Sequence, residues 1–359
     1  MILFICSQET DYLQDLTYAG LAEILGRERV VDFPFHWPYH REKKFLWSKK
    51  TEYPRNLGLV QTPRFLQSHP QSPRRQRGIN RSSWKVRKEL KKNSFQIVVL
   101  GSAKPDALQA LERLLPAIKV PWIFLDGGDW REVGGDFKRT GGQRGFGLFQ
   151  SVSRKKSPSL VFKREMPLDL RNDFIFPFPF SAQVSRIPKL LPSASKKYQV
   201  LFWAVESSEA RRQAFKLLRG RYDCEQNGSV PGQTFRGYSF HGRQYFEALN
   251  ETRVALSFRG EGFDTLRFWE IPACGSLLLS EKPTVQIPHP FEDRVHAVFC
   301  KNDLSDLVTL IDYYISHEKE AQEIAEEGQK HLLRYHTHMR RGEYFLERVR
   351  SRMKIRLGR

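Results

Sequence analysis

The sequence predicts an α/β protein of two Rossmann-like domains, each built on a parallel sheet. Apolar runs of strand length alternate with helical runs in both halves of the chain, and an aromatic, proline-rich stretch at residues 161–192 interrupts the alternation. With 359 residues, 40% of them hydrophobic, the chain can bury two ordinary cores. We therefore expect domains at 1–180 and 181–340, followed by a basic helical tail at 341–359.

The first domain begins with predicted strands at 1–6 and 30–33, on either side of the helical run YLQDLTYAGLAEILG. The runs FQIVVLGS and PWIFLDGGD supply two more buried strands, separated by the helical run DALQALERLLPAI. Residues 36–92 are rich in Pro, Arg, Ser and aromatic residues and show no clear period, which indicates an insertion. The stretch GGDFKRTGGQRGFG lacks the order of a phosphate-binding loop, so we predict a mobile loop there.

The second domain repeats the alternation. Its predicted strands are YQVLFWAV, TRVALSF and HAVFC, and its predicted helices include SSEARRQAFKLLRG, LSDLVTLIDYYISH and EKEAQEIAEEGQKHLLRYH. Because parallel strands end at the same edge of their sheet, we expect ligands at the carboxyl ends of the strands.

The net charge of +19 is concentrated in two segments. Residues 71–92 hold nine Lys or Arg and one acidic residue, and residues 340–359 hold eight Lys or Arg and two Glu. Such segments favour an anionic partner: phospholipid head groups, a polyanionic acceptor or, as the less favoured choice, nucleic acid. Solvated loops would carry the same charge without a partner, and this alternative stays open.

No apolar run reaches the roughly 20 residues of a membrane span, and the first residues lack the basic start of a signal peptide. The four cysteines are widely spaced without a CxxC pair, which favours reduced, mostly buried thiols over disulfides or zinc ligands. We expect a cytoplasmic protein with peripheral contact to the inner membrane face, and no cofactor or metal.

The most informative motif is RGEGFDTLRFWEIPACGSLLL, which starts at Arg259. Gly260 and Gly262 allow a tight turn after a strand, and Asp264 or Thr265 can cap a short helix that ends before a second strand. A helix N-terminus at this place offers free N–H groups and a positive dipole end to an anion. The motif therefore predicts a phosphate or nucleotide pocket.

The residues GEGFDTLRFWEIPACGSLLLSE and NDLSDLVTLIDYYISHEKEAQEIAEEGQKHLLRYHT resemble the C-terminal half of the GT-B glycosyltransferases, specifically the group-1-like set that includes spore-maturation-type proteins. The first half is similar only in its order of strands and helices, although FKREM and FPFPFS resemble interdomain elements of such proteins. The resemblance implies two Rossmann-like domains facing a central cleft, with a nucleotide-sugar donor on the C-terminal domain, an acceptor on the N-terminal domain and no metal.

The resemblance also implies roles for two carboxylates. Glu270 stands where related proteins bind the ribose hydroxyls. Gly262 stands where they have a carboxylate that contacts the donor sugar, and Glu261 lies one residue further away. Glu270 could instead form an ion pair with Arg267 one turn earlier. Arg259 and Arg267 flank the turn and could neutralise a diphosphate, or they could be ordinary surface arginines.

Further candidates lie at other strand ends. Ser207 and Arg211 could form a second phosphate contact, although plain helix capping by Ser207 also explains the serine. Asp126 and Asp129 in FLDGGDW could orient or deprotonate an acceptor hydroxyl, and turn formation by the DGG sequence is the alternative. His331, His336 and His338 resemble a metal cluster only superficially, and we predict none.

The sequence thus favours a metal-independent glycosyltransferase, a hexosyl- or related transferase, that moves a sugar from a nucleotide-sugar donor to an anionic glycan, cell-envelope or lipid-linked acceptor. Its predicted catalytic residues are Asp126, Asp129 and Glu261. The alternatives are a non-catalytic basic protein that binds nucleic acid or another polyanion on the same fold, and a different nucleotide-using enzyme of the same architecture.

Overall fold

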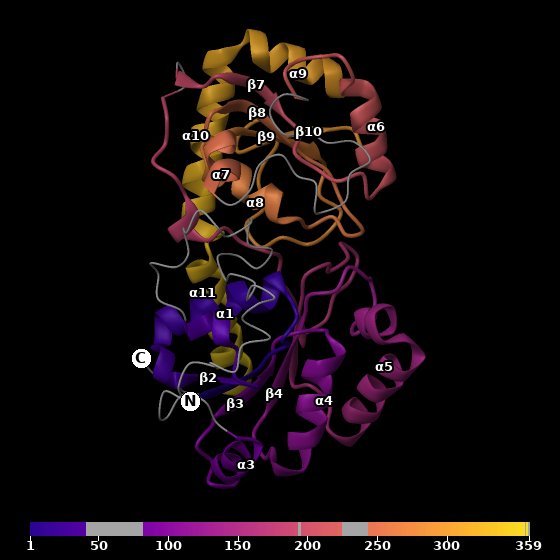
Figure 1. Ribbon diagram of the computed structural model, residues 1–359, viewed down its shortest axis with the longest axis vertical. Coiled ribbons are helices and arrows are strands. Elements are labelled where there is room, and N and C mark those ends of the chain that lie inside the picture. Colours follow the sequence, from indigo (N-terminus) through magenta and orange to yellow (C-terminus); the bar gives the residue numbers. More distant parts are fainter. Residues whose placement is uncertain (41–81, 193–194, 225–242, 356, 358–359) are drawn as a thin grey trace, which may run out of the picture. The chain divides into compact units, whose positions relative to one another are not determined.

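The computed structural model describes residues 1–40, 82–192, 195–224, 243–355 and 357, and the chain forms two compact units (Figure 1). Among these residues, the first unit takes 1–40, 82–179 and those from His338 onward, and the second takes those from Phe180 to Thr337. The chain thus leaves the first unit at Pro179, one residue before the predicted boundary, and returns to it at His338. Part of the predicted insertion lies outside the described residues, and so does half of the first basic segment, residues 71–81.

The first unit is built on a parallel sheet with the strand order β2-β1-β3-β4-β5-β6. Its strands are β1 (Ile2–Ile5), β2 (Val30–Phe33), β3 (Ile97–Leu100), β4 (Trp122–Asp126), β5 (Leu160–Lys163) and β6 (Ile175–Pro177). The first four were predicted. The last two lie where the alternation was expected to stop. They were not predicted because β5 ends in a lysine and β6 has only three residues. β6 ends in proline, a residue tolerated at a sheet edge.

Helices cover both faces of this sheet. They are α1 (Tyr12–Leu25), α3 (Ser83–Lys91), α4 (Pro105–Leu114), α5 (Asp136–Lys155) and α11 (His338–Met353), with short 3-10 turns η1 (Arg27–Arg29), η2 (Trp37–His40) and η4 (Leu115–Ala117). Alternate strand residues point to opposite faces. Leu3 and Phe124 pack in the core with α3, α4 and α5, whereas Phe4 contacts Tyr18 of α1.

Helix α11 corrects the expectation of a basic helical tail at 341–359. It lies beside α1 (Figure 1), and a Cβ atom added to Gly20 would come within 2.3 Å of the His338 carbonyl oxygen. Phe345 of α11 also packs on Phe162 of β5, with ring centroids 4.6 Å apart. The C-terminal segment is therefore part of the core of the first unit.

Helix α5 occupies the glycine-rich stretch for which a mobile loop was predicted, so that prediction is wrong. Gly142 interrupts the helix with a φ of +61°, a left-handed conformation that glycine adopts without strain. A Cβ atom on Gly145 would lie 2.6 Å from the Phe137 carbonyl oxygen. The glycines thus permit a kink and a close backbone approach within a helix.

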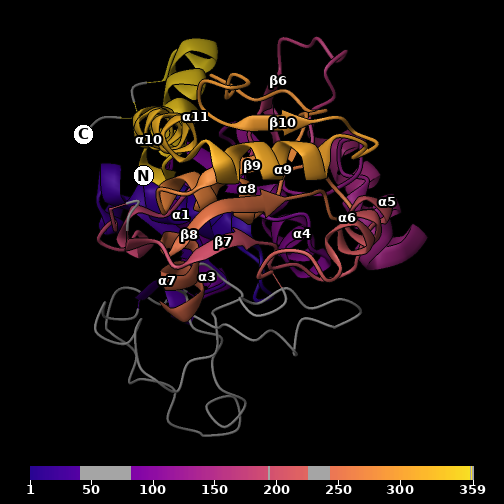
Figure 2. The same cartoon turned by 90° about the horizontal axis from the view of Figure 1, so that it is seen from above.

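The second unit has a four-stranded parallel sheet, and Figure 2 shows its strands side by side in the order β10-β9-β8-β7. They are β7 (Tyr198–Leu201), β8 (Thr252–Ser257), β9 (Leu277–Glu281) and β10 (Val298–Cys300). The helices are α6 (Glu209–Leu218), α7 (Arg243–Asn250), α8 (Leu266–Ala273), α9 (Leu307–Ser316) and α10 (Glu318–Tyr335), and η5 (Val184–Arg186) is a 3-10 turn. Each unit is Rossmann-like, as predicted.

All four cysteines are free and buried, as the sequence predicted. Among the described helices, none is long and apolar enough to cross a bilayer.

Candidate functional site

The loop from β8 to α8 lies at the carboxyl edge of the second sheet, and Glu281 fixes its start. The backbone N–H and the Nε of Arg259 donate to the two carboxylate oxygens of Glu281, each over 2.6 Å. Glu281 is buried at the end of the neighbouring strand β9, whereas 34% of the Arg259 side chain stays exposed. This carboxylate therefore holds Arg259 at the sheet edge and leaves its terminal nitrogens toward solvent.

Helix α8 begins without a side-chain cap. Thr265 occupies the N-cap position but makes no capping bond, because its hydroxyl lies 3.1 Å from the Ser257 hydroxyl instead. Gly262 accepts a hydrogen bond from the Gly260 N–H over 3.0 Å and closes the turn before the helix. The first N–H groups of α8 thus lack a side-chain acceptor, which is the condition for binding an anion at a helix N-terminus.

Arg267 and Glu270 lie in α8 just behind this N-terminus. The Arg267 side chain is buried, with 8% of the residue exposed, and its guanidinium carbon lies 5.8 Å from the centre of the Trp203 ring. Its Nε has no hydrogen-bond partner among the described residues. Glu270 is also buried and accepts a hydrogen bond from the Tyr245 hydroxyl over 2.9 Å. Arg267 thus contacts Trp203 and Glu270 contacts Tyr245, and the ion pair between Arg267 and Glu270 stays a prediction.

Asp264 has a structural place in the turn. One of its carboxylate oxygens accepts from the Phe180 N–H and the other from the Trp269 indole N–H, both over 2.7 Å. The residue is 2% exposed. Both carboxylate oxygens thus hold the turn, and a role of Asp264 in donor binding stays a prediction.

The start of α6 differs from the prediction in its capping residue. Ser208, not Ser207, is the N-cap and accepts from the Arg211 N–H, while its hydroxyl donates to the Arg259 carbonyl over 2.7 Å. Arg211 donates from its guanidinium to the Phe258 and Val205 carbonyls and to the Ser207 hydroxyl. Ser207 and Arg211 thus join the ends of β7 and β8 and support the loop that carries Arg259.

In the first unit, the two predicted catalytic aspartates are held in ion pairs. Asp126 is fully buried and accepts from Lys163 Nζ and from the Gly134 N–H, both over 3.0 Å. Asp129 pairs with the buried Arg164 and lies 3.8 Å from Arg139. These contacts favour the alternative reading, in which the carboxylates stabilise loops, over proton transfer to an acceptor.

Comparison with known proteins identifies the part of the chain that carries this site. Residues 203–347 match the family described as Glycosyl transferase-like, and the match includes Arg259, Arg267 and Glu270. The sequence of this part is therefore similar to the group-1-like glycosyl transferases. The spore-maturation subtype stays a prediction. The sequence matches no curated protein.

Solved structures similar to the whole chain show that it has the GT-B fold. A glycosyltransferase from Rickettsia africae ESF-5 aligns over 98% of each chain with a TM-score of 0.58 and 10% identity. HepE of Anabaena, solved with UDP and glucose, covers 98% of this chain and 99% of its own with a TM-score of 0.57 and 11% identity. HepE solved with UDP-glucose gives a TM-score of 0.54, also at 11% identity. At these identities the likeness shows the fold alone.

Two residues of the second unit that position the site were not predicted. Tyr245 is the hydrogen-bond partner of Glu270, and Glu281 is the partner of Arg259. Tyr245 lies in α7, before the motif, and no sequence spacing links it to Glu270. Glu281 could have been found, because a carboxylate at the end of an apolar strand lies at the ligand edge of a parallel sheet.

The remaining predicted residues are Glu261 and three histidines. Glu261 is exposed in the loop before α8. His331 and His336 both lie with a ring nitrogen 2.8 Å from the His289 carbonyl oxygen, and His338 belongs to the first unit. The described residues hold no group of three metal-ligating side chains.

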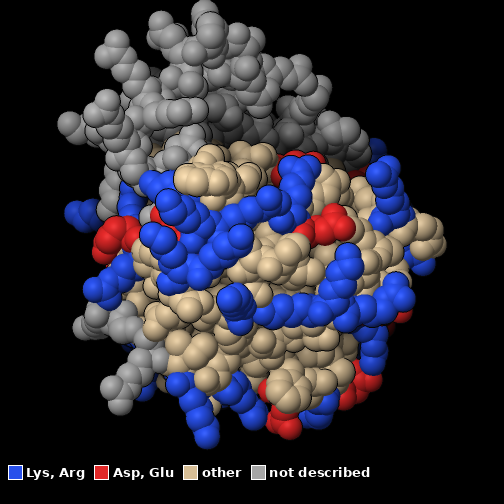
Figure 3. All heavy atoms as spheres, turned by 90° about the horizontal axis from the view of Figure 1, so that it is seen from below, with Lys and Arg blue, Asp and Glu red and all other residues tan. Residues whose placement is uncertain are grey.

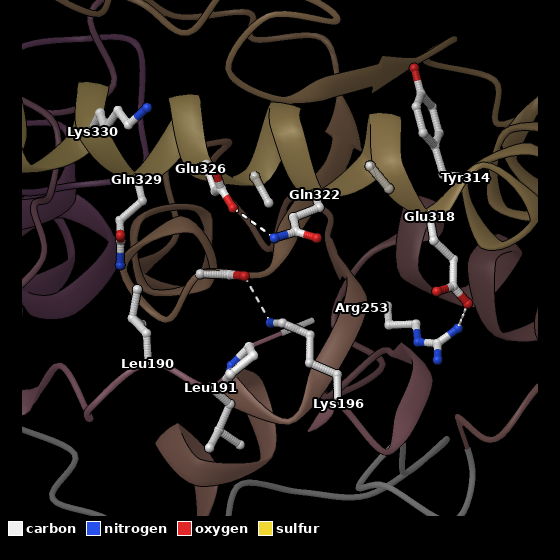
Figure 4. A pocket seen from close by; sticks show the side chains of 14 residues that line it. Leu190, Leu191, Lys196, Arg253, Tyr314, Glu318, Gln322, Glu326, Gln329 and Lys330 are labelled. Carbon is white, nitrogen blue, oxygen red and sulfur yellow. Dashed lines mark hydrogen bonds and ion pairs between the residues drawn. The ribbon is translucent and has the colours of Figure 1, made fainter. Parts of the chain in front are cut away.

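The second unit also has a cavity of about 380 Å³ at the opposite edge of its sheet, against α10 (Figure 4). There Lys196 donates to three backbone carbonyls over 2.8–3.1 Å, those of Asn250, Thr252 and Gly275. Arg253 pairs with Glu318 on the far side. Because these charged groups already have partners, we assign the cavity no ligand.

Proposed function

We propose that the protein is a glycosyltransferase that moves a sugar from a nucleotide-sugar donor to an acceptor, and that the donor binds at the carboxyl edge of the second sheet. The observation that carries this proposal is the Arg267 guanidinium, which is buried next to an uncapped helix N-terminus and has an Nε without a partner among the described residues. A buried cation of this kind needs an anion, and a donor diphosphate provides one.

The chemistry follows from these positions. As the glycosidic bond breaks, negative charge grows on the leaving diphosphate, and preorganised cations and N–H groups stabilise it. Arg267 is buried beside the N-terminus of α8, and Arg259 offers its remaining nitrogens from the edge. Glu270 would accept hydrogen bonds from the ribose hydroxyls beside its bond to Tyr245. Glu261 remains the candidate for contact with the donor sugar.

The glycosyl transferase-like family match supports a nucleotide-sugar as the donor, and the UDP complexes of HepE make UDP the first nucleotide to test. The acceptor, which we propose to be a glycan, cell-envelope or lipid-linked molecule, would bind to the first unit. We further propose that the reaction needs no metal, because arginines and a helix dipole can neutralise the leaving group.

Calorimetry with a panel of nucleoside diphosphates tests the donor site. One of them should bind, and Glu270→Gln should weaken it by about 10- to 100-fold, the range for losing hydrogen bonds to a charged group. Glu326→Gln on the exposed face of α10 is the matched control and should leave the affinity unchanged. Absence of binding across the panel, or equal weakening by both substitutions, would overturn the proposal.

A further inference from the structure

The amino edge of the first sheet gathers positive charge from several helix ends. All six strands are parallel, so the helix that precedes a strand ends at this edge. The last turns of these helices are basic: Lys88 and Lys91 in α3, Arg113 in α4 and Lys155 in α5, all exposed. Arg352 in the last turn of α11 pairs with Asp173, just before β6, and so lies at the same edge. We call this surface the basic edge.

The basic edge forms a broad face. Figure 3 views the molecule from the side on which α3 lies, and Lys and Arg side chains spread over the described part of that face with few Asp or Glu between them. Six parallel strands spaced by about 4.8 Å span roughly 24 Å. The positive charge is therefore distributed over a surface wider than a single helix.

Helix dipoles explain only part of this pattern. A cation in the last turn of a helix is stabilised by the negative dipole end, so Lys91 or Arg113 alone would need no ligand. Lys85, however, lies in the first turn of α3, where a cation is unfavourable, and that turn holds no acidic residue. Lys85 and Lys88 project from the face of α3 opposite to the buried Val86 and Leu90.

Two large aromatic side chains are exposed beside these cations or beside the strand ends. Trp84 at the start of α3 is 70% exposed, and Lys88 Nζ lies 5.0 Å from the centre of its ring. Phe174 is 62% exposed, and its carbonyl accepts from the Val161 N–H at the start of β5, which places it beside the strand ends. Exposed aromatic rings among lysines and arginines are typical of surfaces that rest at the interface of a bilayer.

We propose that the basic edge binds the surface of a bilayer containing anionic phospholipids. Lys and Arg would lie against the head groups, and Trp84 and Phe174 would enter the interfacial layer. A nucleic-acid duplex is the competing partner, but it is held by a helix in a groove or by a channel that follows the backbone. A wide face with cations from several helix ends and two separate aromatic rings fits a flat anionic surface better.

This inference is independent of the proposed donor site, which belongs to the other unit. The basic edge lies at the amino ends of the first sheet, and Asp126 and Asp129 lie at its carboxyl ends. Strands of four or five residues separate the two edges by roughly 13–17 Å. The carboxyl edge would thus face away from the bilayer.

Vesicle sedimentation with the full chain tests the proposal. Vesicles of phosphatidylcholine with added phosphatidylglycerol should bind the protein, vesicles of phosphatidylcholine alone should not, and added salt should weaken the binding. The triple substitution Lys85→Glu, Lys88→Glu and Lys91→Glu should lower the partition coefficient by at least about 100-fold, since each basic residue near such a surface contributes a factor of roughly five. Trp84→Ala should also lower it, and because this side chain is exposed the substitution leaves the core intact.

The matched control carries the same change of charge on the second unit, with Lys216, Arg219 and Lys319 each changed to Glu. These residues are exposed on α6, its C-cap and α10. Binding retained by this control and lost in the α3 variant supports the proposal. Three outcomes would overturn it: equal loss of binding in both variants, no binding to anionic vesicles, or binding to a nucleic-acid duplex but not to vesicles. Calorimetry of the α3 variant with the nucleoside diphosphate should show unchanged affinity. This measurement distinguishes a loss of membrane binding from a damaged donor site.

Discussion

The carboxyl edges of the two sheets have similar charged residues but use them differently. In the first unit, Lys163 and Asp126 neutralise each other within the core, and Arg164 pairs with Asp129. In the second unit, Arg267 is buried with an Nε that has no partner among the described residues. A charged residue at a ligand edge is thus stronger evidence for a binding site when neighbouring side chains have not already neutralised it.

The largest effect is expected from breaking the internal pair of the first unit. Lys163→Met should lower the free energy of unfolding by about 3–5 kcal/mol, because it leaves the Asp126 carboxylate buried without its cation. Lys155→Met, which removes an exposed lysine from the same unit, should change it by less than about 0.5 kcal/mol. Urea unfolding measures both. A small loss of stability for Lys163→Met would contradict this, and Asp126 would again be a candidate catalytic acid.

A second test concerns Lys196, the buried lysine of the second unit that is bonded to carbonyls. Burial lowers the pKa of Lys196 to about 8, well below that of an unfolded chain. Between pH 8 and 10 the unfolded state then binds more protons, so the free energy of unfolding should rise with pH, by up to about 2–3 kcal/mol. Lys196→Met should remove this rise. Urea unfolding near pH 7 and near pH 10 tests it, and parallel curves for both proteins would contradict it.

The third test addresses the available cation. Arg267→Met should weaken binding of the nucleoside diphosphate by about 10- to 100-fold, because one charge-assisted contact to phosphate is lost. Stability should change little, since the substitution removes a buried charge and keeps an apolar side chain against Trp203. Arg253→Met at the opposite edge of the same sheet is the control in calorimetry. Unchanged affinity in the Arg267 variant would mean that Arg267, like the paired residues of the first unit, does not bind a ligand.

The smallest effect is expected for Asp129, which is partly exposed and shares its cation Arg164 with Glu165. Asp129→Asn should cost about 1 kcal/mol of stability and leave donor affinity unchanged. A general base would behave otherwise, because its loss lowers the transfer rate by about 100-fold or more. Unfolding and a transfer assay on the same variant separate the two roles, and a large rate loss would restore the predicted one.

Periodicity predicted most of the fold because strands such as IVVL at 97–100 are short apolar runs between helices. It failed where composition and structure disagree. Four glycines in α5 suggested a loop, although the lack of a side chain at Gly145 lets the Phe137 carbonyl approach its backbone within the helix. The basic C-terminal residues suggested a tail, although Phe345 and Val349 of the same helix are buried.

The site was predicted in part for similar reasons. The turn and helix after β8 follow from local glycines and a strand–helix boundary, so Arg259, Arg267 and Glu270 could be named from the sequence. Whether a side chain is already paired depends on residues far away in the chain. Asp264, for example, is bonded to Phe180, which is 84 residues distant. Sequence patterns carry no information on such partners.

The place of α11 has a consequence for synthesis on the ribosome. Domains usually fold as they emerge, the N-terminal one first. Here the first unit lacks a core helix until His338–Met353 has left the exit tunnel, whereas all the residues of the second unit precede that helix. The first unit is therefore expected to complete its fold after the second, and its nascent sheet must keep Phe4 and Phe162 from aggregation until α11 has emerged.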